Sequence, residues 1–260
     1  MKFLKLLRHL IAFFFLTIIT QVGGLVWVLA LFISVKYKKK KRFIFPILYL
    51  TFNLLIIPPI AKQFGRERLP IFSKNLKPRN WIYPLFFRNY VTPNLKSLLE
   101  ISSKKLKQNN IQITYLDANF PFINKFPLLP HLSHNDGKKI DISFMYLDKN
   151  RKATAKKPSV SGYGTYTNPE KNHTSESCLK KGYWQYDFSK YLTFGTLNNL
   201  KLDKNGTFIL IKELLSHSKT QKIFIEPHLK QSLKLNNETK IRFHGCQAVR
   251  HDDHIHLQIK

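Results

Sequence analysis

Two uncharged runs near the N-terminus constrain the fold more than any other feature. Leu10 to Val35 is 26 residues without a charge and is rich in Phe, Leu, Ile and Val. A bilayer core needs about 20 apolar residues as helix, and the apolar region of a cleaved signal peptide has only about 7–15. Phe43 to Ala61 is a second uncharged run, of 19 residues, interrupted by three prolines. We expect two transmembrane helices; the alternative is one span followed by a buried or membrane-associated segment.

The charges around these runs predict an orientation. The connecting loop, Lys36 to Arg42, holds six Lys and Arg residues, and short loops dense in basic residues stay in the cytoplasm. This places the N-terminus and everything after the second run outside the cytoplasm. Basic residues near both outer ends, such as Lys2, Lys5 and Arg66, oppose this orientation.

The rest of the chain predicts an α+β domain. Residues 1–61 form the membrane part with its basic loop, 62–90 a proline-punctuated linker, and 91–260 the folded domain. We expect a small antiparallel sheet with helices on one side. Helices are predicted from Thr92-Pro93 to about Lys107 and over Phe208–His217. Strands are predicted over Ile111–Leu116, Lys138–Leu147, Ile223–Ile225, Ile241–Phe243 and His254–Ile259. Residues 148–182, rich in Lys, Ser, Thr, Gly and Asn, form a long loop or hairpin insertion.

Net charge limits the partners of the chain. There are 43 Lys and Arg residues against 15 Asp and Glu, a net charge of +28. Such an excess favours an anionic partner, whether nucleic acid, a lipid surface or an acidic polymer, although a solvated lysine-rich surface explains it equally well. No basic stretch interleaved with aromatics resembles a nucleic-acid module. The two cysteines, Cys178 and Cys246, exclude a cysteine-based zinc cage and can either pair outside the cytoplasm or remain free.

Histidines gather in two groups that suit a metal site. The first is His131-Leu-Ser-His134-Asn-Asp-Gly-Lys-Lys-Ile-Asp141, and the second is His251-Asp-Asp-His254-Ile-His256. Imidazole and carboxylate are the usual ligands of a catalytic zinc, three from the protein with one position left open. The Asp136-Gly137 turn lets the chain reverse, so that Asp141 can return to the metal bound by His134.

The second group lies on a predicted strand. His254 and His256 are two residues apart, so their side chains point to the same face. One can bind a metal ion while the other lines the adjoining cleft. Asp252 and Asp253 either orient these histidines or are solvated turn residues. His244, close to the second group but outside its pattern, is interpreted as a surface histidine.

These motifs resemble a known superfamily. The pattern H-x6-D followed by H-x-H resembles that of lysostaphin-type peptidases, D-Ala-D-Ala metallopeptidases and Hedgehog domains. The fuller form, with His131 and His251 included, resembles the penicillin-insensitive murein endopeptidases. The resemblance covers roughly residues 110–260. It includes neither the membrane segments nor the insertion around 149–182.

The resemblance implies a zinc cleft and a set of roles. His134, Asp141 and His256 would bind Zn²⁺, and His131 would flank the first ligand. His254 would act on the attacking water as base or stabilise the oxyanion, with His251 as a second active-site histidine. No Glu lies near the H-x-H motif, so a histidine must move the proton.

We therefore expect a membrane-anchored zinc metallopeptidase that cuts an amide bond next to a D-amino acid in cell-wall (murein) peptides. Its catalytic domain would face the periplasm or the cell exterior from the cytoplasmic membrane. The alternatives are a zinc carboxypeptidase or amidase acting on another substrate, and a zinc-containing binding module without catalysis. Nucleic acid is not an expected partner.

Overall fold

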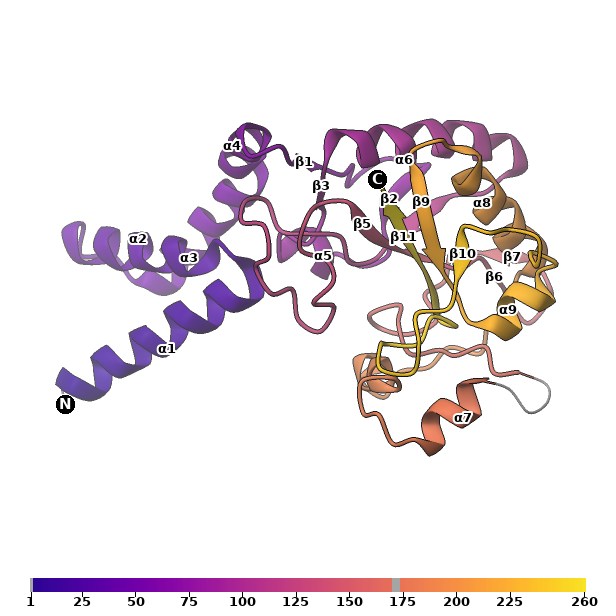
Figure 1. The fold of residues 1–260 in the computed structure, drawn as a ribbon. Coiled ribbons are helices and arrows are strands. Elements are labelled where there is room, and N and C mark those ends of the chain that lie inside the picture. Colours follow the sequence, from indigo (N-terminus) through magenta and orange to yellow (C-terminus); the bar gives the residue numbers. More distant parts are fainter. Residues whose placement is uncertain (1, 170–173) are drawn as a thin grey trace.

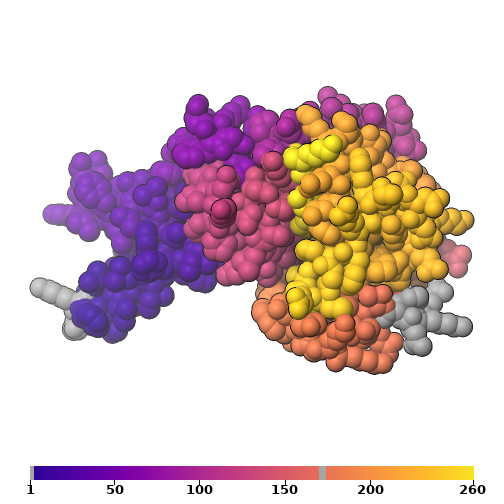
Figure 2. Space-filling view, in the orientation of Figure 1, coloured from indigo at the N-terminus to yellow at the C-terminus, as the bar shows by residue number. Residues whose placement is uncertain are grey.

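The computed structural model of the chain describes residues 2–169 and 174–260 (Figure 1). Met1 and residues 170–173 lie outside the described residues, and so does that part of the predicted 149–182 insertion. Within the described residues the chain is a mixed α/β protein with nine α-helices and three sheets. Figure 2 shows the N-terminal helices projecting from one end of the larger, rounded remainder.

The central sheet has six strands in the order β10-β9-β11-β5-β4-β2. Their bounds are β2 Leu76–Pro78, β4 Ile113–Tyr115, β5 Lys139–Ser143, β9 Thr220–Phe224, β10 Ile241–Arg242 and β11 His254–Ile259. The four inner strands are antiparallel, while β10 pairs with β9 and β2 with β4 in parallel. The expectation of a purely antiparallel sheet is therefore wrong at both edges.

Two long helices pack on this sheet as the apolar spacing predicts. Helix α6, Pro93–Leu106, begins with the proline that follows Thr92, because proline is tolerated where a helix leaves its first N–H groups unpaired. Helix α8, Lys204–Ser216, starts four residues before the predicted boundary, where Asp203 caps it by accepting a hydrogen bond from the Gly206 amide. Their leucines and isoleucines join the strands in one buried core.

Residues 62–90 take part in the fold and are more than a linker. They contain β1 (Glu67–Arg68), α5 (Ile82–Leu85) and β2, and they lead into β3 (Tyr90–Val91). Strand β2 is an edge strand of the central sheet, and β1 pairs with β3. Of the prolines that suggested a linker, Pro78 is the last residue of β2 and Pro84 lies within α5.

The predicted strand Lys138–Leu147 is two strands in the structure. After β5 the chain leaves the central sheet at Phe144 and enters β6, Tyr146–Leu147. β6 lies between β7 (Ala153–Thr154) and β8 (Lys201–Leu202) in a separate three-stranded sheet. The remaining short elements are the 3₁₀ segments η2 (Lys107–Asn109) and η3 (Phe188–Thr193) and the helices α7 (Thr174–Lys180) and α9 (Pro227–Ser232).

The first apolar run is divided into two helices. α1 covers Lys2–Thr20 and α2 covers Gly23–Lys36, with a break at Gln21, whose φ is +64°. The two helices approach closely because Gly24 has no side chain: a Cβ there would lie 2.0 Å from the Thr17 hydroxyl oxygen. The single helix expected over this run is thus a hairpin.

Two helical segments are long and apolar enough to cross a membrane. They are Phe3–Thr20 and Lys41–Gln63, whereas α2 is shorter. The second segment combines α3 (Lys41–Thr51), a π-helical turn η1 (Phe52–Ile56) and α4 (Ile57–Gln63). The hairpin places the N-terminal end of α1 and the α2–α3 connection on the side away from the central sheet (Figure 1).

The helical hairpin is docked on the folded domain. The Gln21 side-chain oxygen accepts hydrogen bonds from the backbone N–H groups of Phe122 and Ile123, at 2.9 and 3.4 Å. Around this point, apolar residues of α2, α3 and α4 share a buried cluster with Phe87 and Phe120. The segment that follows, up to His134, carries the first histidine group.

This arrangement bears on the predicted orientation of the N-terminus. If α1 and α3–α4 cross a membrane, the N-terminal lysines and the basic loop lie on one side of it, and the positive-inside rule then favours both in the cytoplasm and the domain on the opposite side. In intact cells, a membrane-impermeant maleimide should label Lys149→Cys but neither Lys5→Cys nor Lys39→Cys. All three should react after permeabilisation. Labelling of Lys5→Cys alongside Lys149→Cys would instead support an N-terminus outside the cytoplasm.

Candidate metal centre

A buried carboxylate stands at the centre of the histidine groups. Asp141 lies on β5 and is 1% exposed. In the antiparallel pairing of β5 with β11, His256 is its direct partner, and His254 pairs with Ser143, two residues away. The alternation of side chains along β11 therefore turns both histidines toward the face that carries Asp141, as the sequence predicts.

Three potential ligand atoms converge at this point. Asp141 Oδ1 lies 3.2 Å from His134 Nε2 and 2.9 Å from His256 Nδ1, and the two nitrogens are 3.2 Å apart. Ligand atoms that surround a tetrahedral zinc at about 2.0 Å are separated by roughly 3.3 Å. The three residues predicted as ligands thus already have nearly the spacing that a shared zinc ion requires.

A hydrogen bond to the backbone fixes the orientation of the His134 ring. Its Nδ1 lies 2.9 Å from the Ala118 carbonyl oxygen, so the Nδ1–H donates to the backbone and Nε2 is the nitrogen left to bind a metal. Nε2 is the atom that faces Asp141. An outer hydrogen bond of this kind is typical of histidine ligands of metals.

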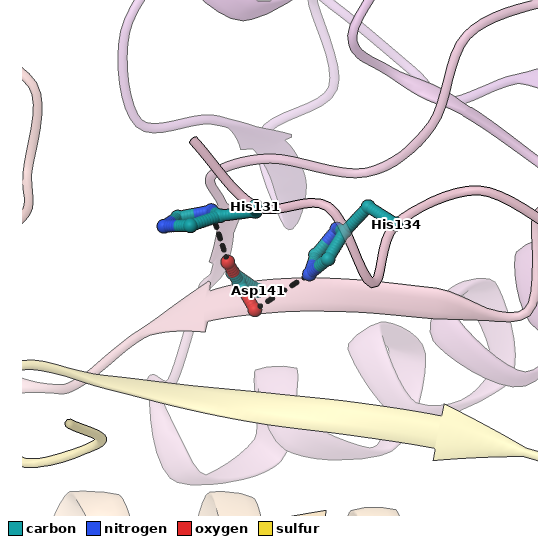
Figure 3. A group of neighbouring side chains, drawn as sticks. All are labelled: His131, His134 and Asp141. Atoms are coloured by element: carbon teal, nitrogen blue, oxygen red, sulfur yellow. Dashed lines mark ion pairs between the residues drawn. The ribbon is translucent and has the colours of Figure 1, made fainter. Parts of the chain in front are cut away.

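His131 lies on the other side of the same carboxylate (Figure 3). His131, His134 and Asp141 form a buried group that could hold a metal ion, since one ligand atom of each lies within 4.8 Å of the others. The Nδ1 of His131, however, is 3.0 Å from Asp141 Oδ2 and 3.2 Å from Asp117 Oδ2. It bridges two carboxylates, while His134 faces the opposite oxygen, Oδ1.

Further residues hold these carboxylates in place. The Tyr163 hydroxyl donates to Asp141 Oδ2 at 2.7 Å, so this oxygen is occupied and Oδ1 is left facing the histidines. Arg88 forms an ion pair with Asp117 and donates to its Oδ2 at 2.8 Å. Both buried carboxylates, Asp141 and Asp117, therefore have hydrogen-bond or ion-pair partners.

A second carboxylate orients His254. Asp253 Oδ1 accepts a hydrogen bond from His254 Nδ1, and its Oδ2 accepts from the Gly164 amide at 2.6 Å and from Ser189 at 3.1 Å. His254 Nε2 then points to the cluster, 3.6 Å from Asp141 Oδ1. Of the two interpretations of Asp253, orientation of a histidine is the one the geometry supports.

His251 is the least constrained of the predicted site residues. It is buried, and its ring lies 4.9 Å from that of His254 and 5.5 Å from that of His256. Its Nδ1 has no hydrogen-bond partner among the described residues. Asp252, next to it, forms an ion pair with Arg250 and contacts no histidine of the cluster directly.

The pKa values follow from burial and from this mixture of charges. Burial alone would raise the pKa of Asp141, but His134 and His254 hold it well below its ordinary value. Burial would lower the pKa of His131, yet hydrogen bonds to Asp117 and Asp141 raise it to about 9. Burial lowers the pKa of His256 to about 3. His131 therefore carries a proton at neutral pH, whereas His256 does not.

The cluster opens into a cavity of about 190 Å³. One wall is the segment Pro130–His134; the other is formed by Gln185 and by residues between His244 and Val249. His244, interpreted from the sequence as a surface histidine, is exposed but lines this cavity, with its ring stacked 4.2 Å from that of Phe224.

The sequence predicted the histidines of the site but not the residues that form hydrogen bonds to them and to Asp141. Asp117 and the Ala118 carbonyl lie in no recognisable motif, and nothing in the sequence indicates that Tyr163 reaches Asp141. A tyrosine that follows Gly162 in a long polar insertion carries no signal of a structural partner 22 residues earlier.

Comparison with known proteins adds no family to this geometry: neither a family model nor a curated protein matches the chain.

A disulfide braces the outer wall of the cavity. Cys178 on α7 is bonded to Cys246, which lies between His244 and Gln247, and the two are 68 residues apart in sequence. Of the two alternatives left by the sequence, the structure has the paired one. Disulfides persist in oxidising compartments, which agrees with a domain outside the cytoplasm.

We expect the Cys178→Ser/Cys246→Ser double variant to lose about 4 kcal/mol of unfolding free energy, because a loop of this length restricts the unfolded chain. Urea denaturation of both proteins in the same detergent measures the difference. The unreduced, denatured wild type should contain no reactive thiol. Two reactive thiols per chain would show that the cysteines are free.

Proposed function

We propose that the protein is a membrane-anchored zinc peptidase that hydrolyses amide bonds in murein peptides. The observation that carries the proposal is the triangle formed by His134 Nε2, Asp141 Oδ1 and His256 Nδ1, with edges of 2.9–3.2 Å. Two nitrogens and one carboxylate oxygen are a donor set that zinc accepts in catalytic sites. The cavity beside them leaves room for a substrate.

His256 is a better third ligand than His131 on geometric grounds. The nitrogen of His131 that approaches Asp141 lies between Oδ2 of Asp117 and Oδ2 of Asp141, whereas His134 faces the other oxygen of Asp141, Oδ1. His256 Nδ1 shares the oxygen Oδ1 with His134. We therefore assign the zinc to His134, Asp141 and His256, and assign to His131 the role of holding Asp141.

Zinc bound here would polarise the scissile carbonyl and lower the pKa of a water molecule. The residues of the chain would transfer the protons that the hydrolysis requires. His254, fixed by Asp253 at Nδ1, presents Nε2 to the cluster, where it can accept a proton from the nucleophile and deliver one to the leaving amine. The absence of a glutamate among the residues that line this cavity leaves the task to histidine.

The substrate class rests on the resemblance of the two histidine motifs to murein endopeptidases. Two properties of the chain agree with it. The net charge of +28 attracts an anionic polymer such as murein. The disulfide and the apolar helices suit a domain held at the outer side of the cytoplasmic membrane.

Metal analysis tests the ligand set. The full chain, purified in detergent, should contain about one zinc, and His134→Ala, Asp141→Ala and His256→Ala should each lose it. The full chain is needed because β2 lies before residue 91 and belongs to the central sheet.

Two variants serve as controls. His131→Ala should keep its zinc if His131 only holds Asp141, and should lose it if His131 is a ligand. His217→Ala, whose imidazole contacts Ser102 and Glu213 away from the cavity, should leave the zinc content unchanged. Full zinc content in all three ligand variants would refute the site.

Catalysis is tested separately from binding. His254→Ala should keep its zinc and lose about 10²–10⁴-fold in the rate of murein hydrolysis, the usual contribution of a general acid or base. Product analysis of digested murein by mass spectrometry measures the rate and identifies the bond. If zinc-loaded wild type cuts no murein peptide, the non-catalytic binding module becomes the better hypothesis.

A further inference from the structure

A second cavity lies near the β2 edge of the central sheet. It has a volume of about 390 Å³ and shares no lining residue with the metal cavity. Its walls come from the segment before β2, the turn between α6 and β4, and residues 153–155 on and after β7. Lys74, Arg79 and Lys107 contribute three cations, and no Asp or Glu is among its lining residues.

Arg79 is the unusual member of this cavity. Its side chain is buried, with the residue only 8% exposed, yet it forms no ion pair with any described residue. Its one hydrogen bond runs from Nη1 to the Ala155 carbonyl oxygen at 3.3 Å, and Nε has no partner. Its guanidinium also lies over the Tyr146 ring, 5.6 Å from the centroid.

Two other arginines have the countercharge that Arg79 lacks: the buried Arg250 is paired with Asp252, and the half-buried Arg88 with Asp117. The buried Arg66 also forms no ion pair with a described residue, but it donates to the Asn124 side chain. A buried charge costs free energy unless a countercharge or hydrogen bonds compensate it. At Arg79 the protein supplies one carbonyl and one aromatic face, and the remaining donors are left for something that enters the cavity.

We propose that this cavity binds an oxyanion of the phosphate class. A guanidinium presents donors in a planar fork that matches two oxygens of such a group. Lys74 and Lys107 add positive charge at the rim, and Asn110 and Gln112 add amide groups. The cavity is larger than a single phosphate, so it can also take a phosphate carried by a larger soluble molecule.

The position of the cavity favours a soluble ligand over the headgroups of a membrane crossed by α1 and α3–α4. α6 starts beside the N-terminal helices and ends at the far side of the domain (Figure 1), and Lys107 and Asn110 follow its end. Lys107 and Asn110, which line the cavity, thus lie at the end of α6 that is farther from α1–α4 (Figure 1). The ligand of this cavity comes from solution or from a polymer.

Binding is measured by calorimetric titration of the chelator-treated full chain in uncharged detergent, because zinc could itself bind phosphate. Inorganic phosphate should bind saturably at about one site. Glycerol 1-phosphate should bind at the same site and compete with it. Arg79→Gln should weaken the affinity about tenfold or more, since it removes charge-assisted hydrogen bonds.

Because Arg79 is buried, a second variant keeps the test informative. Lys74→Gln/Lys107→Gln alters only exposed side chains and should also weaken phosphate binding, while the matched exposed change Lys181→Gln should not. The proposal is overturned if phosphate shows no saturable binding, or if its affinity is the same in the wild type and both cavity variants. Arg79-dependent binding to phosphatidylglycerol vesicles without binding of either soluble phosphate would overturn the assignment to a soluble ligand.

Discussion

The pairing of β5 with β11 determines the site. Because His256 lies directly opposite Asp141, a carboxylate and an imidazole from distant parts of the chain meet in the middle of the sheet. Side chains alternate along a strand, so a shift of one residue would move His254 and His256 to the other face. The apolar residues that alternate with these histidines, Ile255 and Leu257, are fully buried in the core and fix this register.

The two oxygens of the Asp141 carboxylate contact different groups. Tyr163 and His131 bind Oδ2, whereas His134 and His256 meet at Oδ1. Oδ2 therefore binds the groups that hold Asp141 in place, and Oδ1 faces the candidate metal ligands. A single imidazole beside Asp141 would be an ordinary buried ion pair, whereas two nitrogens within 3.2 Å of one oxygen and of each other form a group that could hold a metal ion.

Much of this could be predicted from periodicity and spacing. The strand His254–Ile259 and the start of α6 at Pro93 agree with the sequence, because alternation and N-terminal proline are local signals. The convergence of His134, Asp141 and His256 also agrees with the motifs. The features that the sequence did not predict depend on contacts between distant parts of the chain. The break in the first helix at Gln21 depends on contacts with Phe122 and Ile123, about 100 residues later. Edge strand β2 was hidden for the same reason, since a three-residue strand ending in proline is recognisable only beside its partner β4.

The docking of Gln21 has a mechanical consequence. The backbone it holds, at Phe122 and Ile123, leads within a dozen residues to His134, and an apolar cluster joins the same region to α2–α4. The domain therefore rests against the N-terminal helices and is not joined to them by a free tether. With α1 and α3–α4 in a bilayer, the metal cavity would keep a constant height above the lipid, and the fold would set the distance from the membrane at which the proposed substrate can be reached.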